Sequence, residues 1–421
     1  MHIWYVHPYG GGPGVGLYDR PYQLARAWQR QGHSATIFLA RFHHLLERDV
    51  ALEPEFDIDG VRYVSLPARQ YAKNGVARLL NILDFSRSLY LVGDGYARQV
   101  PRPDAIIVSS PHPFSIFPAH KLARRHRAQL VFEIRDIWPL SITEILDTSP
   151  FHPFVQMCSF AERFALRNAD LIASVLPRAD RYLHDRGYGH KPFAWLPNSI
   201  NLQTNPNSDK FTSEAAVKAA EKSRQWRSEG IPTVIYTGSI GRPNALDLLL
   251  RAVKHGSASD PERRCGVLIV GKGDQIEELT RIAEAEQLRN VHFTGAVPKN
   301  DALKLLREAD IGYAGLRNIE ALFQYGVSPN KIADYLSASL PVLLPLAPCG
   351  DPVSESGGGI ARRAETPEAV WNALRELILL SPDERRALGE RGKAYMAREY
   401  NYDEIARRYL GAIERTPEFN A

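Results

Sequence analysis

The feature that most constrains the fold is an alternation of short apolar segments, typical of strands, with segments of helical spacing. Ile3–Val6 predicts a strand, Tyr18–Gln31 has the apolar spacing of a helix, and Ser34–Leu39 predicts the next strand. Alternating β and α segments at this spacing are typical of a doubly wound parallel sheet. The pattern restarts with a strand at Val234–Tyr236 and a helix at Ala245–His255. Because 421 residues exceed one typical core, we expect two α/β domains.

The expected boundary between the domains lies near residue 200. The alternation pauses around Pro197-Asn198-Ser199, and the following segment Asn201–Glu229 is rich in Lys, Ser and Glu. We interpret that segment as a linker or surface excursion, so the predicted domains cover residues 1–198 and 199–399. The stretch Thr366–Glu414 is predicted to be mostly helical.

Composition and cysteine usage exclude several classes of protein. With 44% hydrophobic and 24% charged residues the chain is ordinary for a globular protein, and no apolar run is long enough to span a membrane. Cys158, Cys265 and Cys349 are odd in number and far apart, which favours a reducing cytoplasm over a disulfide framework or a zinc site. Met1–Val6 is interrupted by Pro8 too soon for a signal peptide and predicts a first strand.

One region of the N-terminal half is basic, although the net charge of the whole chain is only +4. Between Arg69 and Arg127 stand ten Lys or Arg and three Asp or Glu, interleaved with aromatic and leucine side chains. Such a mixture is found where proteins lie on anionic lipid, but a solvated helix face has the same composition. No nucleic-acid motif accompanies the basic residues, so nucleic acid is not expected as a partner.

Loops that directly follow strands are the first places to look for a site, because ligands of open α/β sheets bind beyond the carboxyl ends of the strands. Gly10–Gly16 follows the first strand and superficially suggests a dinucleotide fingerprint. The acidic residue that such a site needs after the second strand is missing, since Arg41 stands there. We therefore expect a flexible loop at a cleft and no bound NAD.

Two short glycine loops follow strands in the C-terminal half. In Gly238-Ser239-Ile240-Gly241 the glycines would let the backbone approach a pyrophosphate at the start of the next helix. In Gly271-Lys272-Gly273 the lysine would reach a phosphate. A plain tight turn also explains either loop.

Polar residues follow two strands in the N-terminal half. His112 lies between two prolines, which restrict its backbone, and it is either a donor to a substrate hydroxyl or a structural or surface histidine. Arg135 and Asp136 stand side by side at a strand end, where burial without partners is costly. We expect an ion pair there, either functional or structural. The sequence has no nucleophile elbow and no metal-spaced histidine cluster.

The most informative local motif is Gly326–Tyr335, which precedes the apolar segment Leu340–Leu343. A turn-prone opening leads into a short helix that carries Lys331 and Asp334. A helix N-terminus suits an anion, and a lysine adds charge against phosphate. A carboxylate at i+3 lies on the same face and accepts hydrogen bonds from sugar hydroxyls. One turn of helix would then hold both ends of a nucleotide sugar, although an ordinary capped helix before a buried strand fits as well.

Together, these motifs resemble the bacterial family-4 retaining glycosyltransferases of the GT-B fold, and in particular their capsule and O-antigen branch. The resemblance covers nearly the whole chain, and its most specific parts are Phe132–Pro139, Tyr236–Gly241 and Ser328–Tyr335. Pro197–Ile200 resembles the interdomain segment of that family, and Val291–Pro298 the segment whose backbone recognises the nucleotide base. The fold that it implies is α/β of the GT-B type. In that fold two Rossmann-like doubly wound parallel-sheet domains face each other across a cleft, the first on the acceptor side and the second on the donor side.

The resemblance also implies roles for individual residues. Asp334 occupies the second acidic position of the family's Glu-x7-Glu motif and would hold the ribose hydroxyls, while His112 would contact the donor sugar. The final helix, about residues 400–421, would pack back onto the N-terminal domain. The implied catalytic residues are His112, Lys331, Asp136 and Arg135. The implied donor-binding residues are Gly238, Ser239, Gly241, Arg242, Lys272, Val297, Ser328, Pro329, Asn330 and Asp334. The residues implied to close over the cleft beside the acceptor are Gly11, Gly12 and Gly14.

The chain departs from the family pattern at the donor site. Gly326 stands at the first acidic position, so a carboxylate at the donor sugar is missing there. The family's basic pair after the first strand of the C-terminal domain falls on Ser239 and Asn244. The charge of the phosphates would then be met by Lys331 together with Arg242 or Lys272.

The activity that the resemblance implies is transfer of a hexosyl or N-acetylhexosaminyl group from a nucleotide diphosphate sugar, with retention and without metal or cofactor. A UDP-sugar is the default donor, and the acceptor would be a lipid-linked saccharide or an oligosaccharide in cell-surface polysaccharide synthesis. The protein would be cytoplasmic and peripheral at the inner face of the cell membrane, with its basic stretch on anionic lipid. Two alternatives stay open: a nucleotide-sugar 2-epimerase on the same fold, and a non-catalytic sugar-nucleotide-binding scaffold, which Gly326 favours.

Overall fold

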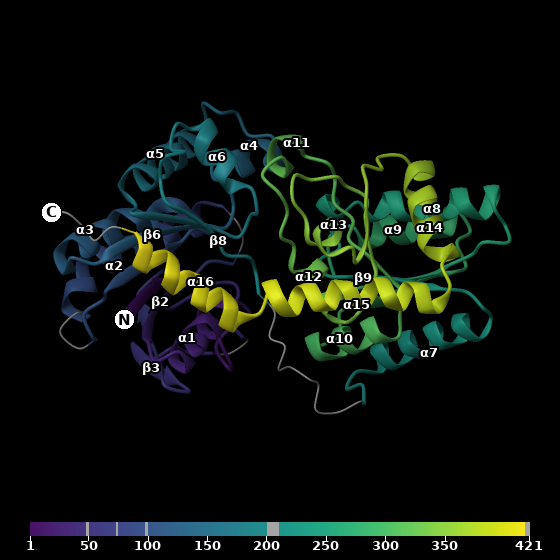
Figure 1. Ribbon diagram of the computed structural model, residues 1–421, viewed down its shortest axis with the longest axis horizontal. Coiled ribbons are helices and arrows are strands. Elements are labelled where there is room, and N and C mark those ends of the chain that lie inside the picture. The colour runs from purple at the N-terminus through teal and green to yellow at the C-terminus, as the bar shows by residue number, and fades with distance from the viewer. Residues whose placement is uncertain (48–49, 73–74, 97–99, 200–209, 417–421) are drawn as a thin grey trace. The chain divides into compact units, whose positions relative to one another are not determined.

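The computed structural model describes residues 1–47, 50–72, 75–96, 100–199 and 210–416, which form two compact units (Figure 1). Unit 1 comprises Met1–Ser199, Gln324–Gly326 and Tyr402–Ala421, and unit 2 comprises Ile200–Phe323 and Val327–Asn401. Both units are parallel-sheet α/β domains, which confirms the predicted fold class. The predicted boundary after residue 198 falls beside this division.

Unit 1 is built on an eight-stranded sheet in the order β3-β4-β2-β1-β5-β6-β7-β8. Neighbouring strands run parallel except β3 and β4, which are antiparallel. The strand order reverses between β1 and β5, which is where open α/β sheets bind ligands at the carboxyl ends of their strands. The strands are β1 (His2–Val6), β2 (Ser34–Ala40), β3 (Glu55–Ile58), β4 (Val61–Leu66), β5 (Ala105–Ser109), β6 (Gln129–Ile134), β7 (Leu171–Ser174) and β8 (Phe193–Trp195). The helices are α1 (Arg20–Arg30), α2 (Val76–Tyr96), the short 3-10 helix η1 (Pro113–Ser115), α3 (Ile116–His126), α4 (Leu140–Leu146), α5 (Pro153–Asn168), α6 (Ala179–Asp185) and α16 (Tyr402–Arg415).

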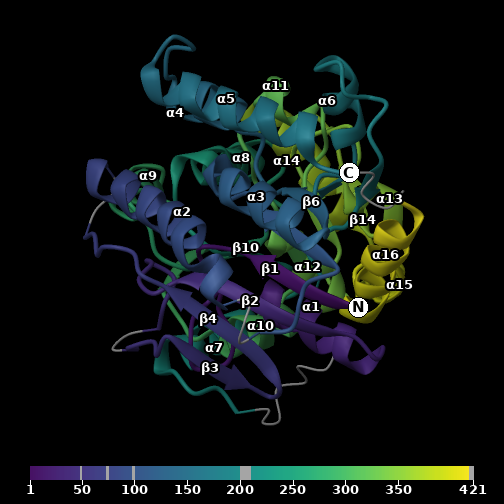
Figure 2. The ribbon, with the colours of Figure 1, turned by 90° about the vertical axis from the view of Figure 1, so that its left-hand side faces the viewer.

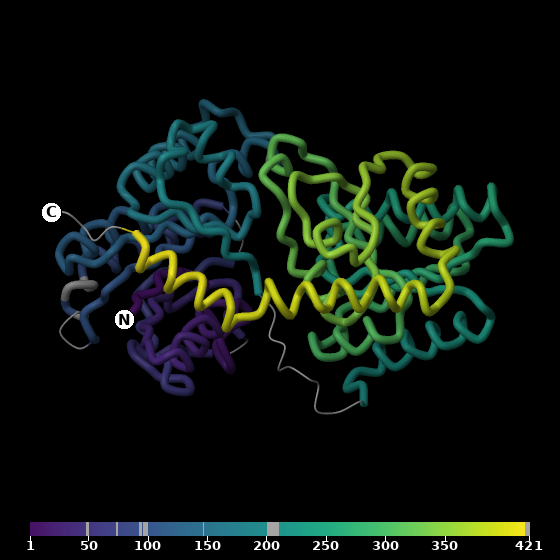
Figure 3. Tube along the Cα trace, viewed as in Figure 1, coloured from purple at the N-terminus to yellow at the C-terminus, as the bar shows by residue number. Residues whose placement is uncertain are grey.

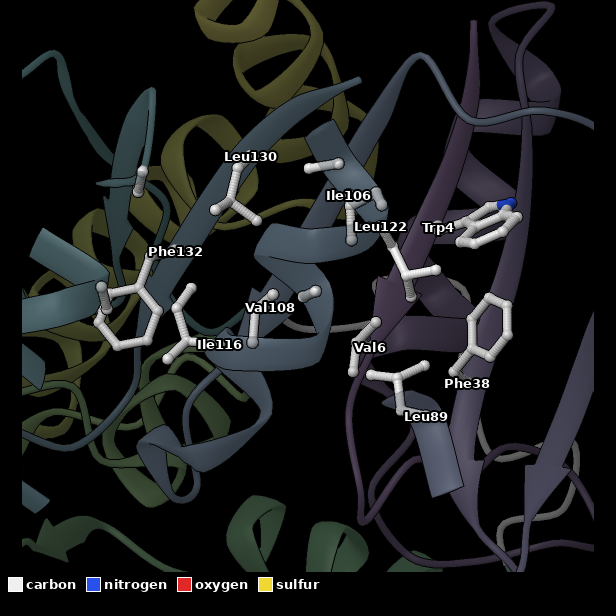
Figure 4. Close-up of a cluster of buried hydrophobic side chains, with 14 of the residues drawn as sticks. Trp4, Val6, Phe38, Leu89, Ile106, Val108, Ile116, Leu122, Leu130 and Phe132 are labelled. Atoms are coloured by element: carbon white, nitrogen blue, oxygen red, sulfur yellow. The ribbon is translucent and has the colours of Figure 1, made fainter. Parts of the chain in front are cut away.

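The sheet of unit 1 buries both of its faces. Because successive side chains of a strand point to opposite faces, Trp4 of β1 packs in one apolar cluster and Tyr5 in another. The first cluster includes side chains of α2 and α3, which lie side by side (Figure 2), and Figure 4 shows Trp4 there beside Phe38. The second cluster includes side chains of α1 and of α16, the yellow helix at the end of the chain in Figure 3.

Unit 2 is built on a six-stranded sheet in the order β11-β10-β9-β12-β13-β14, in which all neighbouring strands are parallel. Here the order reverses between β9 and β12. The strands are β9 (Thr233–Thr237), β10 (Gly266–Val270), β11 (Val291–Gly295), β12 (Ile311–Tyr313), β13 (Val342–Leu344) and β14 (Gly359–Ala361). The helices are α7 (Glu214–Ser228), η2 (Arg242–Asn244), α8 (Leu246–Ser259), α9 (Ile276–Ala285), α10 (Lys299–Arg307), α11 (Glu320–Phe323), α12 (Asn330–Ser337), α13 (Pro352–Ser356), α14 (Pro367–Leu379) and α15 (Pro382–Glu399).

The prediction of a linker or surface excursion over Asn201–Glu229 is wrong for the helix α7. The Ser213 side chain caps this helix by accepting a hydrogen bond from the amide of Ala216. The Trp226 ring is buried against Gly266 of β10, where any side chain at residue 266 would clash with it. Lys, Glu and Arg occupy the solvent face of α7, and its buried face consists mostly of alanines. The composition of the segment therefore does not indicate a packed helix. Residues 200–209 of the predicted linker lie outside the described residues.

Over the described residues, no helix is both long enough and apolar enough to cross a bilayer.

Candidate functional site

Three loops stack at the carboxyl edge of the unit 2 sheet, because glycines let their backbones touch. A Cβ on Gly271 would lie 1.8 Å from the carbonyl oxygen of Gly238, and a Cβ on Gly273 would lie 2.0 Å from that of Ile240. The amide of Gly271 also donates to the carbonyl of Gly295, at the end of β11. The glycine loops 238–241 and 271–273, which lie far apart in the sequence, are therefore parts of one surface.

Lys331 lies in the first turn of α12, and its ammonium reaches the loop after β9. The Nζ atom donates to the hydroxyl of Tyr236 at 3.1 Å and to the side-chain oxygen of Asn244, and it lies 4.4 Å from the centre of the Tyr236 ring. Burial lowers the pKa of Lys331 to about 8. Both of these partners are neutral oxygens, so the ammonium can still pair with an anion.

Tyr236 and Asn244 also shape the loop itself. The Tyr236 hydroxyl and the Asn244 amide both donate to the carbonyl of Ser239. The same two side chains therefore hold the loop and the ammonium of Lys331. The sequence analysis named Asn244 only as a departure from the family's basic pair and gave Tyr236 no role. The position of Tyr236 near the end of β9, just before a glycine loop, was a usable signal.

The other predicted donor-binding residues spread around this loop. Pro329 precedes α12 and Asn330 begins it, while Asp334 lies one turn further on and is half-buried, like Ser328. The remaining ones are Gly241, which precedes η2, Val297, which is half-buried after β11, and the exposed pair Arg242 and Lys272.

Gly326 has a backbone reason for being glycine. Its φ of +91° lies in the left-handed region that favours glycine. An acid at this position would be strained in the backbone conformation that the chain adopts here.

In unit 1, histidines from three adjacent strand ends surround Tyr9. His7 follows β1, His43 follows β2 and His112 follows β5, and these strands are neighbours in the order β2-β1-β5. The ring centres of these histidines lie 6.2, 5.8 and 6.1 Å from that of Tyr9, and the ring centre of His44 lies 5.0 Å away. We call Tyr9, His7, His43 and His112 the histidine cluster.

The histidine cluster contains buried polar atoms that have no hydrogen-bond partner among the described residues. The amide of Tyr9 donates to Nδ1 of His7, which places the proton of this neutral ring on Nε2. His43 donates from Nε2 to the carbonyl of Gly10, which leaves its Nδ1 as an acceptor. Four ring nitrogens have no hydrogen-bond partner among the described residues: Nε2 of His7, Nδ1 of His43 and both nitrogens of His112. Burial lowers the pKa of His43 to about 4 and that of His112 to about 3, so these rings are neutral donors and acceptors suited to hydroxyl groups.

The expected ion pair between Arg135 and Asp136 does not form. The Arg135 side chain donates to the amide oxygen of Asn198 at 2.8 Å and lies over the ring of Tyr18, whereas the Asp136 side chain is exposed. Adjacent residues at the end of a strand point in different directions, so neighbours in sequence need not meet.

The buried ion pair of this region is instead Arg20–Glu133, which the sequence analysis did not predict. Arg20 meets Glu133 at 2.8 Å, and Tyr5 donates to the same carboxylate at 2.6 Å. The charge of Arg20 holds the pKa of Glu133 at about 2 despite the opposing effect of burial. Arg20 also donates to the carbonyls of Leu196 and Pro197, so the pair ties β6 to the segment that follows β8.

The glycine loop after β1, which the sequence predicts to be flexible, is folded back on itself by backbone hydrogen bonds. The amides of Val15 and Gly16 donate to the carbonyl of Gly12, and a Cβ on Gly11 would lie 2.5 Å from the carbonyl oxygen of Gly16. Gly11 and Gly12 are buried, and Gly14, with a φ of +71°, is exposed at the tip.

Among the described residues, no group of three or more His, Cys, Asp or Glu side chains could hold a metal ion.

Two family models match the chain, one on each unit. A glycosyl transferase 4-like domain matches residues 15–199, and a domain of glycosyl transferases group 1 matches residues 231–379. The chain is also similar to the GDP-mannose-dependent monoacylated alpha-(1-6)-phosphatidylinositol monomannoside mannosyltransferase of Corynebacterium glutamicum. The two are 24% identical over 245 residues, which are 54% of this chain and 58% of that relative. The chain thus spans little more than half the length of this curated relative.

Several solved structures share the fold over nearly the full length. Sucrose-phosphate synthase from Thermosynechococcus elongatus has a TM-score of 0.70 at 16% identity, covering 99% of this chain and 98% of that one. WaaG, a glycosyltransferase involved in lipopolysaccharide biosynthesis, has a TM-score of 0.63 at 16% identity, covering 98% and 100%. Anabaena HepE in complex with UDP-glucose has a TM-score of 0.63 at 14% identity, covering 98% and 99%. At these identities the likeness shows the fold alone. Nothing in these comparisons supports the epimerase alternative.

Proposed function

The chain carries the two domains of a family-4 glycosyltransferase of the GT-B fold, and from this premise we propose that it transfers a sugar from a nucleotide diphosphate sugar to a hydroxyl group of an acceptor. The observation that carries the proposal is the Lys331 ammonium, held by two neutral oxygens against a glycine loop at the carboxyl edge of the unit 2 sheet. A diphosphate beside that loop would supply the anion that this cation lacks.

The residues of unit 2 would act on the leaving group. When the bond between the anomeric carbon and the phosphate oxygen breaks, negative charge grows on the diphosphate. Lys331 and the N-terminal end of α12 would stabilise that charge, an electrostatic role like that of an oxyanion hole. The acceptor oxygen then bonds to the anomeric carbon, and its proton passes to the leaving diphosphate. Transfer on the same face gives retention, and the positive charge that a metal would supply comes from Lys331.

UDP is the proposed nucleotide. HepE was solved with UDP and with UDP-glucose, which supports a uridine donor, whereas the curated relative is GDP-mannose-dependent by its name. A hexosyl or N-acetylhexosaminyl group is the proposed cargo. Backbone contacts after β11, around Val297, would read the base, so side chains do not report which nucleotide is used.

The proposed acceptor is a lipid-linked saccharide of cell-surface polysaccharide synthesis, of the O-antigen or capsule type. The acceptor named for the curated relative is a phosphatidylinositol monomannoside, and WaaG acts in lipopolysaccharide biosynthesis. Unit 1 adds exposed apolar side chains on α2 and α5, among them Leu91, 60% exposed, and Phe160, 59% exposed. With the basic residues of this region, they support a protein peripheral to an anionic membrane face on the cytoplasmic side.

A thermal-shift screen of UDP, GDP, ADP and their sugar conjugates tests the proposal, because a ligand that binds only the folded state raises its stability. We expect one nucleotide to raise the Tm, and this shift to shrink in Asp334→Ala and Lys331→Ala. Lys393→Ala, which removes an exposed cation of α15, is the matched control and should retain the full shift. No shift with any nucleotide at millimolar concentration would reject the donor site.

A non-catalytic scaffold would bind the same nucleotide sugar but would not turn it over. It rests on Gly326, where the left-handed backbone would strain an acidic residue. Release of nucleoside diphosphate from the donor that binds, measured with and without added acceptor, separates the two. Binding without any turnover would favour the scaffold.

A further inference from the structure

A pocket of about 600 Å³ lies in unit 2 at the amino ends of three neighbouring strands. Its lining includes Pro232 just before β9, Asp310 just before β12 and Pro341 just before β13, and these strands are adjacent in the order β9-β12-β13. Because the strands run parallel, their amino ends share one edge of the sheet. Lys331 and the stacked glycine loops lie at the opposite, carboxyl edge. The pocket is therefore separate from the proposed donor site.

The charged side chains that line the pocket are mostly cations. Among the described residues they are four arginines and one aspartate: Arg227, Arg307, Arg385, Arg386 and Asp310. The Asp310 carboxylate already accepts a hydrogen bond from the amide of Thr233 at 2.8 Å. An excess of positive charge in a concave surface attracts an anion.

Arg385 is the buried cation of this pocket, since its side chain is only 8% exposed. Its Nη1 atom caps the end of α14 by donating to the carbonyls of Leu377, Ile378 and Leu380. Its Nε atom is buried and has no hydrogen-bond partner among the described residues. A buried donor without an acceptor is unfavourable, so the capping of α14 leaves part of this guanidinium for a ligand.

Two of the other arginines are exposed and take part in ion pairs at the surface. Arg386 donates to the carboxylate of Asp383 at 2.7 Å, and Arg227 lies 3.9 Å from the carboxylate of Glu308. Exposed pairs of this kind contribute little to stability. Both guanidinium groups can therefore turn to a ligand in the pocket at small cost.

The uncharged part of the lining is largely apolar. Ile231, Leu340 and Ile378 line the pocket and are buried. Sites for small organic molecules have volumes of about 300–1,000 Å³ and combine apolar walls with a few polar groups that fix the orientation of the ligand. The pocket thus has room for a carbon skeleton beside an anionic group.

We propose that this pocket binds a small organic phosphate monoester, with its phosphate among the arginines and its carbon skeleton against the apolar side chains. A planar guanidinium donates two parallel hydrogen bonds to phosphate oxygens, which makes arginine well suited to this group. The site goes beyond the proposed transfer reaction, because a ligand at the amino edge of the sheet does not occupy the donor site at the carboxyl edge.

The test uses phenyl phosphate as the probe, with binding measured by calorimetry on the full chain. We expect wild type to bind it, and Arg227→Glu and Arg386→Glu each to weaken this binding at least tenfold. Arg251→Glu is the matched control, because Arg251 is an exposed arginine of α8 outside the pocket lining. Lys331→Ala should bind phenyl phosphate as tightly as wild type, since it alters only the donor site.

A further variant tests the buried guanidinium itself. Arg385→Lys keeps a cation at the end of α14 and removes the unpartnered Nε donor, so we expect it to weaken phenyl phosphate at least tenfold. Its Tm is measured alongside to show that it folds. The variants at Arg227 and Arg386, which are exposed, test the pocket even if this one does not fold.

Four outcomes would overturn the inference. The first is no binding of phenyl phosphate at millimolar concentration, and the second is binding that Arg227→Glu and Arg386→Glu leave unchanged. The third is inorganic phosphate binding as tightly as phenyl phosphate, which would show an adventitious ion only. The fourth is binding of phosphatidylglycerol vesicles without binding of phenyl phosphate, which would show that the arginines face a bilayer.

Discussion

Lys331 is a cation whose two hydrogen-bond partners are neutral oxygens, and this makes it the most consequential single residue of the proposed donor site. A charge-assisted contact to phosphate is worth about 1.5–3 kcal/mol, so Lys331→Ala should weaken UDP binding by roughly 10- to 150-fold. Calorimetric titration measures this loss, with Lys393→Ala as the control. Unchanged affinity in Lys331→Ala would place the diphosphate elsewhere.

The same residue predicts how nucleotide binding depends on pH. The pKa of Lys331 is lowered to about 8, so in the free protein the ammonium loses its proton as pH rises through that value. Bound phosphate favours the charged form, so binding takes up a proton at high pH. Affinity for UDP should therefore fall between pH 7 and pH 9 in wild type, and Lys331→Ala should lose this dependence. An equal decline in both proteins would assign the pH effect to another group.

His112 predicts a loss of stability in acid. Its folded pKa is about 3, against about 6.5 in the unfolded chain, because burial disfavours the charged ring. Below pH 6.5 the unfolded state therefore binds the extra proton, and by pH 5 this one residue lowers the free energy of unfolding by about 2 kcal/mol. His112→Gln should flatten the decline of unfolding free energy between pH 7.5 and 5, whereas His190→Gln, at an exposed histidine, should not. An unchanged slope in His112→Gln would contradict the burial argument.

At the residue scale, the sequence predicted the positions of loops better than it predicted which charged side chains pair. It selected His112 and Lys331 because each follows a strand or begins a helix, which are positions that local pattern reveals. It paired Arg135 with Asp136 because they are adjacent, whereas the buried carboxylate Glu133 is paired with Arg20, 113 residues away. Contacts of that separation depend on the strand order of the sheet, which one sequence does not encode locally.

At the scale of elements, the stacked loops of unit 2 depend on glycines that admit no side chain. Gly271→Ala would press its Cβ against the carbonyl oxygen of Gly238 at 1.8 Å, in a backbone with a φ of +146°. The loop must move, so we expect at least a tenfold loss of UDP affinity and about 1–3 kcal/mol of destabilisation. Titration with UDP and urea unfolding measure the two effects.

Gly230→Ala is the matched control for this loop. Gly230 has a φ of +72°, and no atom lies within 4 Å of the place that an alanine methyl group would take. Alanine there should therefore lower the free energy of unfolding by about 1 kcal/mol and leave UDP affinity unchanged. Equal UDP affinity in both variants would show that the packing of the loops does not shape the site.

Elements were predicted well where apolar periodicity was strong and poorly where it was weak. The first strand and the helix after it were foreseen within two residues. The helix α7 was not, because its buried stripe is built of alanines and one tryptophan among many charges. Small side chains carry little hydrophobic signal, yet they let this helix lie close to the sheet.

At the scale of the whole molecule, unit 1 is built from segments that are far apart in the sequence, and this predicts how the protein unfolds. Unit 1 is completed by α16, more than 200 residues after Ser199. The ring of Tyr409 in α16 lies 5.7 Å from that of Trp28, whose indole donates to the carbonyl of Ala406. In unit 2, Trp371 is buried to a similar extent. Each residue thus reports on one unit.

Calorimetry of Tyr409→Ala and Trp371→Ala with saturating UDP tests this division. Removing a buried aromatic side chain costs about 3–5 kcal/mol, whereas UDP at 100 times its Kd adds about 2.7 kcal/mol to the unit that binds it. Tyr409→Ala should therefore lower a transition that UDP does not raise, and Trp371→Ala should lower the transition that UDP does raise. If both substitutions lowered one shared transition equally, the two units would unfold as one, and a C-terminal helix would then serve the stability of the whole chain.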